Sequence, residues 1–123
     1  MLRRLRAHPV ASRWFRRAWA AEIDLVAPEL LAAEVANALL RYVRSGALRT
    51  ADARAGLATV LADPIALAPL RPLVHPALDL ALERDLSVYD ACYVVLAERL
   101  EAPLVTADRR LAGATEQSVL LTD

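Results

Sequence analysis

Short apolar runs alternate with longer helical segments along this chain, and this alternation limits the possible folds more than any other feature of the sequence. Strands are predicted at residues 23–27, 65–70, 103–106 and 118–121, and helices at residues 8–20, 29–44, 50–62, 76–84, 87–100 and 109–112. Strands that are joined through helices tend to run parallel, and the helices then cover the sheet. The sequence therefore predicts an α/β fold with a mostly parallel sheet.

Several helix boundaries are marked by residues that start or stop helices. Ser45 and Gly46 are predicted to end the helix over 29–44, because glycine suits the position just after a helix. Ser87 is suited to begin the helix that follows it. Pro76 is placed in the first turn of its helix, where the missing N–H costs no hydrogen bond.

Length and cysteine content indicate a single domain in a reducing compartment. The 123 residues are the size of one domain, predicted to span residues 1–123. The single Cys92 excludes a disulfide framework within the chain and fits the cytoplasm. Cys92 has no activating base beside it, and it is expected to be a buried, inert thiol near a core stripe of Tyr89, Tyr93 and Leu96. Neither a membrane span nor a signal peptide is expected, because no apolar run is long enough.

Charge is balanced overall but uneven along the chain. Fifteen basic residues, all arginine, balance fifteen acidic ones. The residues before the first acid, Glu22, include Arg3, Arg4, Arg6, Arg13, Arg16 and Arg17. A basic end of this kind fits contact with phosphate or with an acidic partner, and a solvated helix face is the alternative interpretation.

Three carboxylates stand alone in apolar surroundings. Glu34 and Asn37 are the only polar residues in the segment 30–40, and their spacing of three residues places them on one helix face. Asp90 is the only charge in the apolar part of its helix. Asp108 follows an apolar strand, and ligands of open parallel sheets bind at the carboxyl ends of strands. A buried carboxylate is costly unless something compensates it, so all three are candidate site residues.

Each of these acids also has a purely structural interpretation. Ser87 and Asp90 have the spacing of a capping box, with aspartate in place of the usual glutamate. Asp108 is suited to cap a helix beginning at the next residue. Glu34 is suited to pair with an arginine, for example Arg41 on its own helix face.

If the three acids converge, their mutual repulsion is most simply relieved by a cation. All the candidate ligands are oxygens, and the chain has only two histidines and one cysteine. Such a ligand set favours Mg²⁺ or Mn²⁺ over zinc. An acidic site of this kind is typical of phosphate chemistry, in which the metal activates water and neutralises charge on the phosphate.

Three motifs together resemble the VapC-type PIN domains. The runs are LVAPELLAAEVANAL at 25–39, LSVYDACY at 86–93 and PLVTADRRL at 103–111. They come in the family's order, and the resemblance covers the chain from about residue 8 onward. It implies a PIN-like three-layer sandwich, in which helices flank a mostly parallel central sheet.

The resemblance also implies a function and a site. Glu34, Asp90 and Asp108 match three of the family's usual four metal-binding acids, and Asn37 and Thr106 match supporting polar positions. Family members use Mg²⁺ or Mn²⁺ to hydrolyse single-stranded RNA. Many are cytoplasmic toxins of toxin–antitoxin systems, held inactive by a VapB-type antitoxin and often homodimeric. The chain is therefore expected to be a metal-dependent endoribonuclease of this kind, with RNA and an antitoxin as partners.

The start of the chain departs from the family pattern. Family members begin with a strand of the form apolar-apolar-Asp, whereas this chain opens with MLRRLR at residues 1–6. The first strand and its acid are therefore expected to be absent, and this chain is expected to cleave single-stranded RNA weakly or not at all. The alternative is a catalytically impaired PIN-like module that binds antitoxin or RNA without cleaving it.

Overall fold

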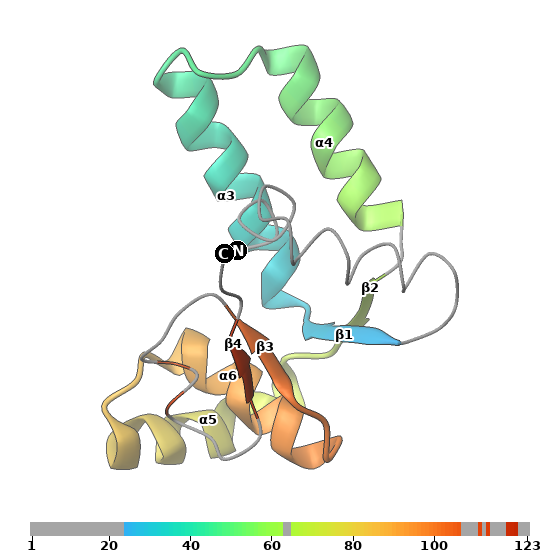
Figure 1. The fold of residues 1–123 in the computed structure, drawn as a ribbon. Helices are drawn as coiled ribbons and strands as arrows, with labels where there is room; N and C mark the ends of the chain where they lie inside the picture. Colours follow the sequence, from blue (N-terminus) through green and yellow to red (C-terminus); the bar gives the residue numbers. More distant parts are fainter. Residues whose placement is uncertain (1–23, 63–64, 107–110, 112, 114–117, 121–123) are drawn as a thin grey trace. The chain divides into compact units, whose positions relative to one another are not determined.

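The computed structural model describes residues 24–62, 65–106, 111, 113 and 118–120 (Figure 1). In chain order, the elements are β1 (Leu25–Pro28), α3 (Leu30–Arg44), α4 (Thr50–Ala62), β2 (Ile65–Ala68), α5 (Arg71–Arg84), α6 (Val88–Arg99), β3 (Leu104–Thr106) and β4 (Ser118–Leu120). Strands and helices alternate as the sequence predicts, and the bounds of α3, α4 and α6 agree closely with the predicted helices. The α/β class is thereby confirmed.

Two compact units make up the chain, Met1–Leu67 and Ala68–Asp123. In the first unit, β1 pairs with β2 in a two-stranded sheet. In the second, β3 and β4 form another two-stranded sheet, and their pairing is parallel, as predicted. The described strands thus form two pairs, and the expectation of one domain over 1–123 stays a prediction.

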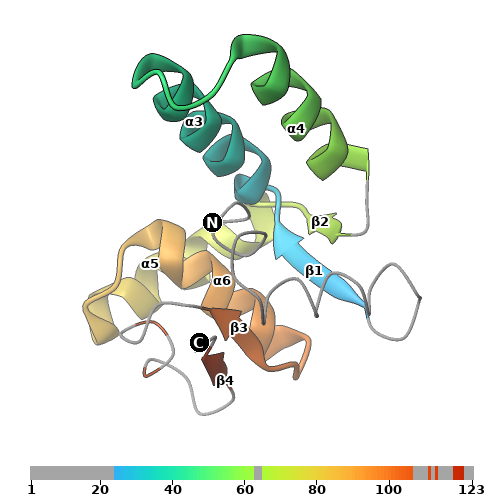
Figure 2. The same ribbon diagram turned by 45° about the horizontal axis from the view of Figure 1, so that its top comes forward.

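The first unit is dominated by a helical hairpin of α3 and α4 (Figure 2). On α3, the buried residues are Leu31, Val35 and Ala38, which recur at the spacing of one helix face. The hairpin turn contains Gly46, whose φ of 81° is left-handed, and a side chain at that angle would be strained. The predicted end of α3 at Ser45 and Gly46 is therefore confirmed.

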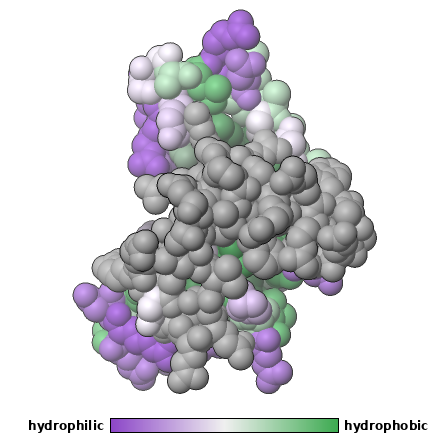
Figure 3. Space-filling model, viewed as in Figure 1, coloured by the Kyte–Doolittle hydropathy of each residue, from purple (hydrophilic) through white to green (hydrophobic). Residues whose placement is uncertain are grey.

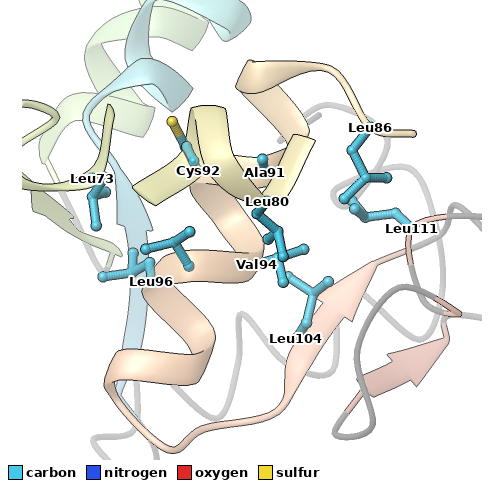
Figure 4. Packing of buried hydrophobic residues seen from close by; sticks show 11 residues of the cluster. Leu73, Leu80, Leu86, Ala91, Cys92, Val94, Leu96, Leu104 and Leu111 are labelled. Atoms are coloured by element: carbon cyan, nitrogen blue, oxygen red, sulfur yellow. The ribbon is translucent and has the colours of Figure 1, made fainter. Parts of the chain in front are cut away.

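The second unit is built around α6, which packs against α5 and β3. Its buried cluster contains Leu73, Ala77, Leu80, Leu86, Ala91, Cys92, Val94, Val95, Leu96, Leu104 and Leu111. Figure 4 shows how these side chains from α5, α6 and β3 meet, with Leu86 and Leu111 close together at one end. The core therefore joins residues that precede α6 in the sequence, such as Leu73, to residues that follow it, such as Leu104.

The predicted start of α5 is wrong. The helix begins at Arg71, and Pro76 lies inside it. Pro72 occupies the first turn, where a proline is favourable because its N–H would have no partner there anyway. Burial of Leu73 holds the additional first turn against the core. Pro72, and not Pro76, is therefore the proline that marks the start of α5.

The predicted core stripe on α6 is only partly correct. Leu96 is buried and Tyr93 packs against the core, but Tyr89 is 64% exposed. Tyr89 lies in the first turn of α6 but points away from the cluster, whereas Val88 and Ala91 of the same turn pack against it or within it. Cys92 is buried and free, as expected.

Some expectations concern residues outside the described part of the chain. These are the helices at 8–20 and 109–112, the basic N-terminal segment and Asp108. Among the described residues, none of the helices combines the length and the apolar content that a bilayer crossing demands.

Packing of α5 against α6 predicts a strong contrast between two leucines of the same helix. Leu80 is 8% exposed and Leu82 is 78% exposed. Leu80→Ala should lower the free energy of unfolding by about 2–5 kcal/mol, because it leaves a cavity in the core. Leu82→Ala is the matched control and should change it by less than about 0.5 kcal/mol. Urea denaturation measures both, and equal effects would contradict the described packing.

Candidate functional site

Asp90 lies in the first turn of α6, where a cap fixes the backbone. Ser87 is the N-cap residue, with extended backbone angles (φ −68°, ψ 157°). The Asp90 amide donates a hydrogen bond of 3.0 Å to the Ser87 hydroxyl oxygen. The carboxylate itself is half-buried, whereas the next two residues, Ala91 and Cys92, are buried. The capping function predicted for Ser87 is confirmed, and it holds Asp90 at the edge of the core.

Thr106 lies at the carboxyl end of β3 and is buried, with 3% of its surface exposed. It is paired in register with Leu120 of the parallel strand β4. Figure 4 shows that the chain turns after α6 and that β3 runs back alongside it. The carboxyl end of β3 and the first turn of α6 therefore lie at the same end of this unit, so Asp90 and Thr106 share the end where ligands of parallel sheets bind.

Asp108 lies outside the described residues, but residues on either side of it are described. Thr106 precedes it and Leu111 follows it, and both are buried. Leu111 belongs to the same cluster as Leu86, which directly precedes the cap residue Ser87 (Figure 4). The described residues on either side of Asp108 thus both lie buried in the second unit.

Glu34 and Asn37 lie on α3 of the first unit. Glu34 is half-buried and Asn37 is exposed. Within the described part of the chain, Arg41 forms no ion pair, so the structural alternative of a pair between Glu34 and Arg41 is not seen. Arg41 is therefore not the partner of Glu34, and Glu34 stays a candidate ligand beside the untested alternative of a pair with another arginine.

Metal-ligating side chains do not cluster among the described residues, since no three of His, Cys, Asp or Glu gather there as a cation site would require. Asp108, the third expected ligand, is not among the residues searched. The convergence of Glu34, Asp90 and Asp108 on one cation accordingly stays a prediction. Tyr89, beside Asp90, is exposed where a core position was predicted, and no local signal in the sequence distinguishes it from Val88 and Ala91, which meet the core.

Comparison with known proteins identifies the family. The PIN domain model matches residues 3–116. Ribonuclease VapC3 from Pyrobaculum aerophilum is 37% identical over 86 residues, which cover 68% of this chain and 66% of that protein. Ribonuclease VapC9 from Mycobacterium tuberculosis is 36% identical over 95 residues, which cover 77% of this chain and 73% of that protein.

A solved structure has the same fold. The crystal structure of PAE2754 from Pyrobaculum aerophilum matches with a TM-score of 0.68 and 32% sequence identity, covering 79% of this chain and 70% of that one. The match to ribonuclease VapC3 from Pyrobaculum aerophilum covers just under two thirds of the length of that protein. Sequence and fold agree, and the chain belongs to the PIN-domain family.

Proposed function

We propose that this chain is a Mg²⁺- or Mn²⁺-dependent endoribonuclease that cleaves single-stranded RNA as the toxin of a VapBC-like pair. Its similarity to two proteins named as VapC ribonucleases supports the reaction class. The structural observation that carries the proposal is Asp90, a half-buried carboxylate that a cap holds at the edge of an apolar core. Thr106 lies at the same end of the unit, where the parallel strand β3 ends.

Glu34, Asp90 and Asp108 are the residues proposed to hold the cation. The donor set fits a hard divalent ion, because carboxylate oxygens are the ligands that Mg²⁺ and Mn²⁺ prefer. The chain's one thiol is unsuited to a softer metal, since Cys92 is buried in the core at 3% exposure. When bound, a divalent cation supplies charge neutralisation at the phosphate and a more acidic water.

Other residues of the chain orient the proposed ligands or supply hydrogen-bonding groups. Ser87 orients the helical turn that carries Asp90, because its hydroxyl accepts the Asp90 N–H. Thr106 brings a buried hydroxyl to the end of β3, and buried hydroxyls require hydrogen-bond partners. Asn37 is exposed and has amide donors that suit a phosphate or a sugar. Asn37 is thus proposed to contact the RNA strand, whereas Ser87 and the buried Thr106 act within the fold, beside the proposed ligands Asp90 and Asp108.

A VapB-type antitoxin is the proposed regulatory partner, and a homodimer in the cytoplasm is the proposed working state. The similarity to VapC ribonucleases supports the antitoxin, and the homodimer and the cytoplasm are expectations from the resemblance to the VapC-type family. The reaction requires an exposed single strand, so an antitoxin that covers the acidic residues would suppress it.

A nuclease assay on circular single-stranded RNA tests this function, because a circle has no ends and only an endonuclease opens it. Cleavage should require Mn²⁺ or Mg²⁺. Glu34→Gln, Asp90→Asn and Asp108→Asn should each reduce it on the order of 10²-fold or more, because displaced reacting groups lose that much rate. The matched controls are Asp79→Asn and Glu83→Gln, which neutralise exposed acids on α5.

The same variants distinguish a metal site from other effects. Mn²⁺ at about 100 times its dissociation constant should stabilise the native chain by about 2.7 kcal/mol, seen as a raised melting temperature. Asp90→Asn should blunt this response and Asp79→Asn should not. If the chain opens no RNA but still binds it, the binding-module alternative holds. If metal stabilises every variant equally, the ligand assignment is wrong.

The cap on α6 gives a further prediction. Ser87→Ala should lower the free energy of unfolding by about 1 kcal/mol, because the Asp90 N–H loses its acceptor. It should also reduce RNA cleavage, because the turn that carries Asp90 is then less well fixed. Ser87→Thr keeps a hydroxyl and should restore most of both losses. Unchanged stability in Ser87→Ala, measured by urea denaturation, would show that the cap contributes nothing.

A further inference from the structure

One face of α3 carries polar side chains along most of the helix. Glu34, Asn37, Arg41 and Arg44 follow one another at intervals of three and four residues, the spacing that places side chains on a single helix face. This face points away from α4, because Leu39, on the other side of α3, is the residue that approaches Gly56 of α4. The candidate ligand Glu34 is therefore aligned with two arginines.

Both arginines are available for a ligand. Arg41 and Arg44 are exposed, and within the described residues neither guanidinium forms an ion pair. Arg49, in the turn after α3, differs because its guanidinium lies 3.1 Å from Asp52. Figure 3 shows hydrophilic residues, in purple, over the outer part of this hairpin.

Helix stability alone does not account for this arrangement. Arg41 and Arg44 stand in the last turn of α3, where positive charge favours the helix dipole by about 0.3–1 kcal/mol. That effect depends on distance from the helix end and not on which face the side chain occupies. It leaves unexplained why both arginines share the face of Glu34 and Asn37.

We propose that this face of α3 is a track for single-stranded RNA, with Arg41 and Arg44 binding phosphates beyond the one that is cleaved. This deepens the proposed function and rests on it for the position of the cleaved bond. Along the helix axis, Arg41 and Arg44 stand about 10 and 15 Å from Glu34, at 1.5 Å per residue. These distances suit phosphates further along the same strand, and a guanidinium forms paired hydrogen bonds with phosphate oxygens.

RNA fits this face better than a protein partner does. Between Glu34 and Arg44 the stripe offers an amide and guanidinium groups, which are the usual donors to the phosphates and sugars of nucleic acids. A protein interface normally has an apolar centre that is shielded from water. At the flank of the stripe, Leu40 is a single exposed apolar side chain, which is too little for such a centre.

The test compares two double variants that remove the same charge. Arg41→Gln with Arg44→Gln alters the track, and Arg54→Gln with Arg71→Gln alters exposed arginines on α4 and α5. Binding of a fluorescent single-stranded RNA of ten nucleotides is measured in EDTA at several salt concentrations. The track variant should bind more weakly, and its logarithmic salt slope should be smaller than that of the unmodified chain by about 1.4, from 0.7 per lost phosphate contact. The control variant should keep most of the affinity and slope.

Cleavage adds a second measurement that separates the two proposals. The track variant should lose kcat/KM on the ten-nucleotide RNA and not on a dinucleotide, which is too short to reach the arginines. If the unmodified chain binds RNA through these arginines but cleaves nothing, the track stands and the proposed function fails. Equal binding by both double variants would overturn the track. Polyglutamate stands in for an acidic protein partner. If the track variant loses as much affinity for polyglutamate as for RNA, the face binds acidic chains in general and the RNA track is overturned.

Discussion

The cost of burying an ionised group inside an apolar core governs the second unit of this protein. Helix α6 is apolar on nearly all sides, and its central residues are buried between α5 and β3. A charge in the middle of such a helix would require a compensating partner. Asp90 avoids that cost by lying in the first turn, where the carboxylate is half-buried and the cap from Ser87 satisfies its backbone N–H. The cost of burying a charge therefore explains why Asp90 lies at the end of α6 and not in its buried middle.

The elements were largely predictable from sequence because their signals are local. Gly46 and Ser87 mark helix ends through backbone geometry and a single hydrogen bond, and both act where predicted. Pro76 misled the prediction because two prolines stood within reach of the same helix start, and burial of Leu73 decided between them. Tyr89 misled the prediction because its helical spacing from Tyr93 and Leu96 suggested a buried face, whereas in the first turn of α6 Val88 and Ala91 are the residues that meet the core.

The site was predictable only as a set of residue types. Isolated acids in apolar runs identify Glu34 and Asp90, and the structure finds both half-buried. Whether carboxylates from distant parts of the chain meet depends on tertiary arrangement, which no local signal encodes. Membership of the PIN family raises the expectation of a nuclease, but a fold does not by itself establish a reaction.

Burial of Cys92 makes the chain's one thiol a native reporter of structural opening. Only 3% of the residue is exposed, and it sits among core residues of α5 and α6. A reagent that alkylates thiols must wait until this packing opens, so the labelling rate follows the population or the rate of that opening. Because the reporter lies two residues from Asp90 on α6, its reactivity would reveal whether a cation at Asp90, or an RNA strand on α3 of the first unit, also tightens this core.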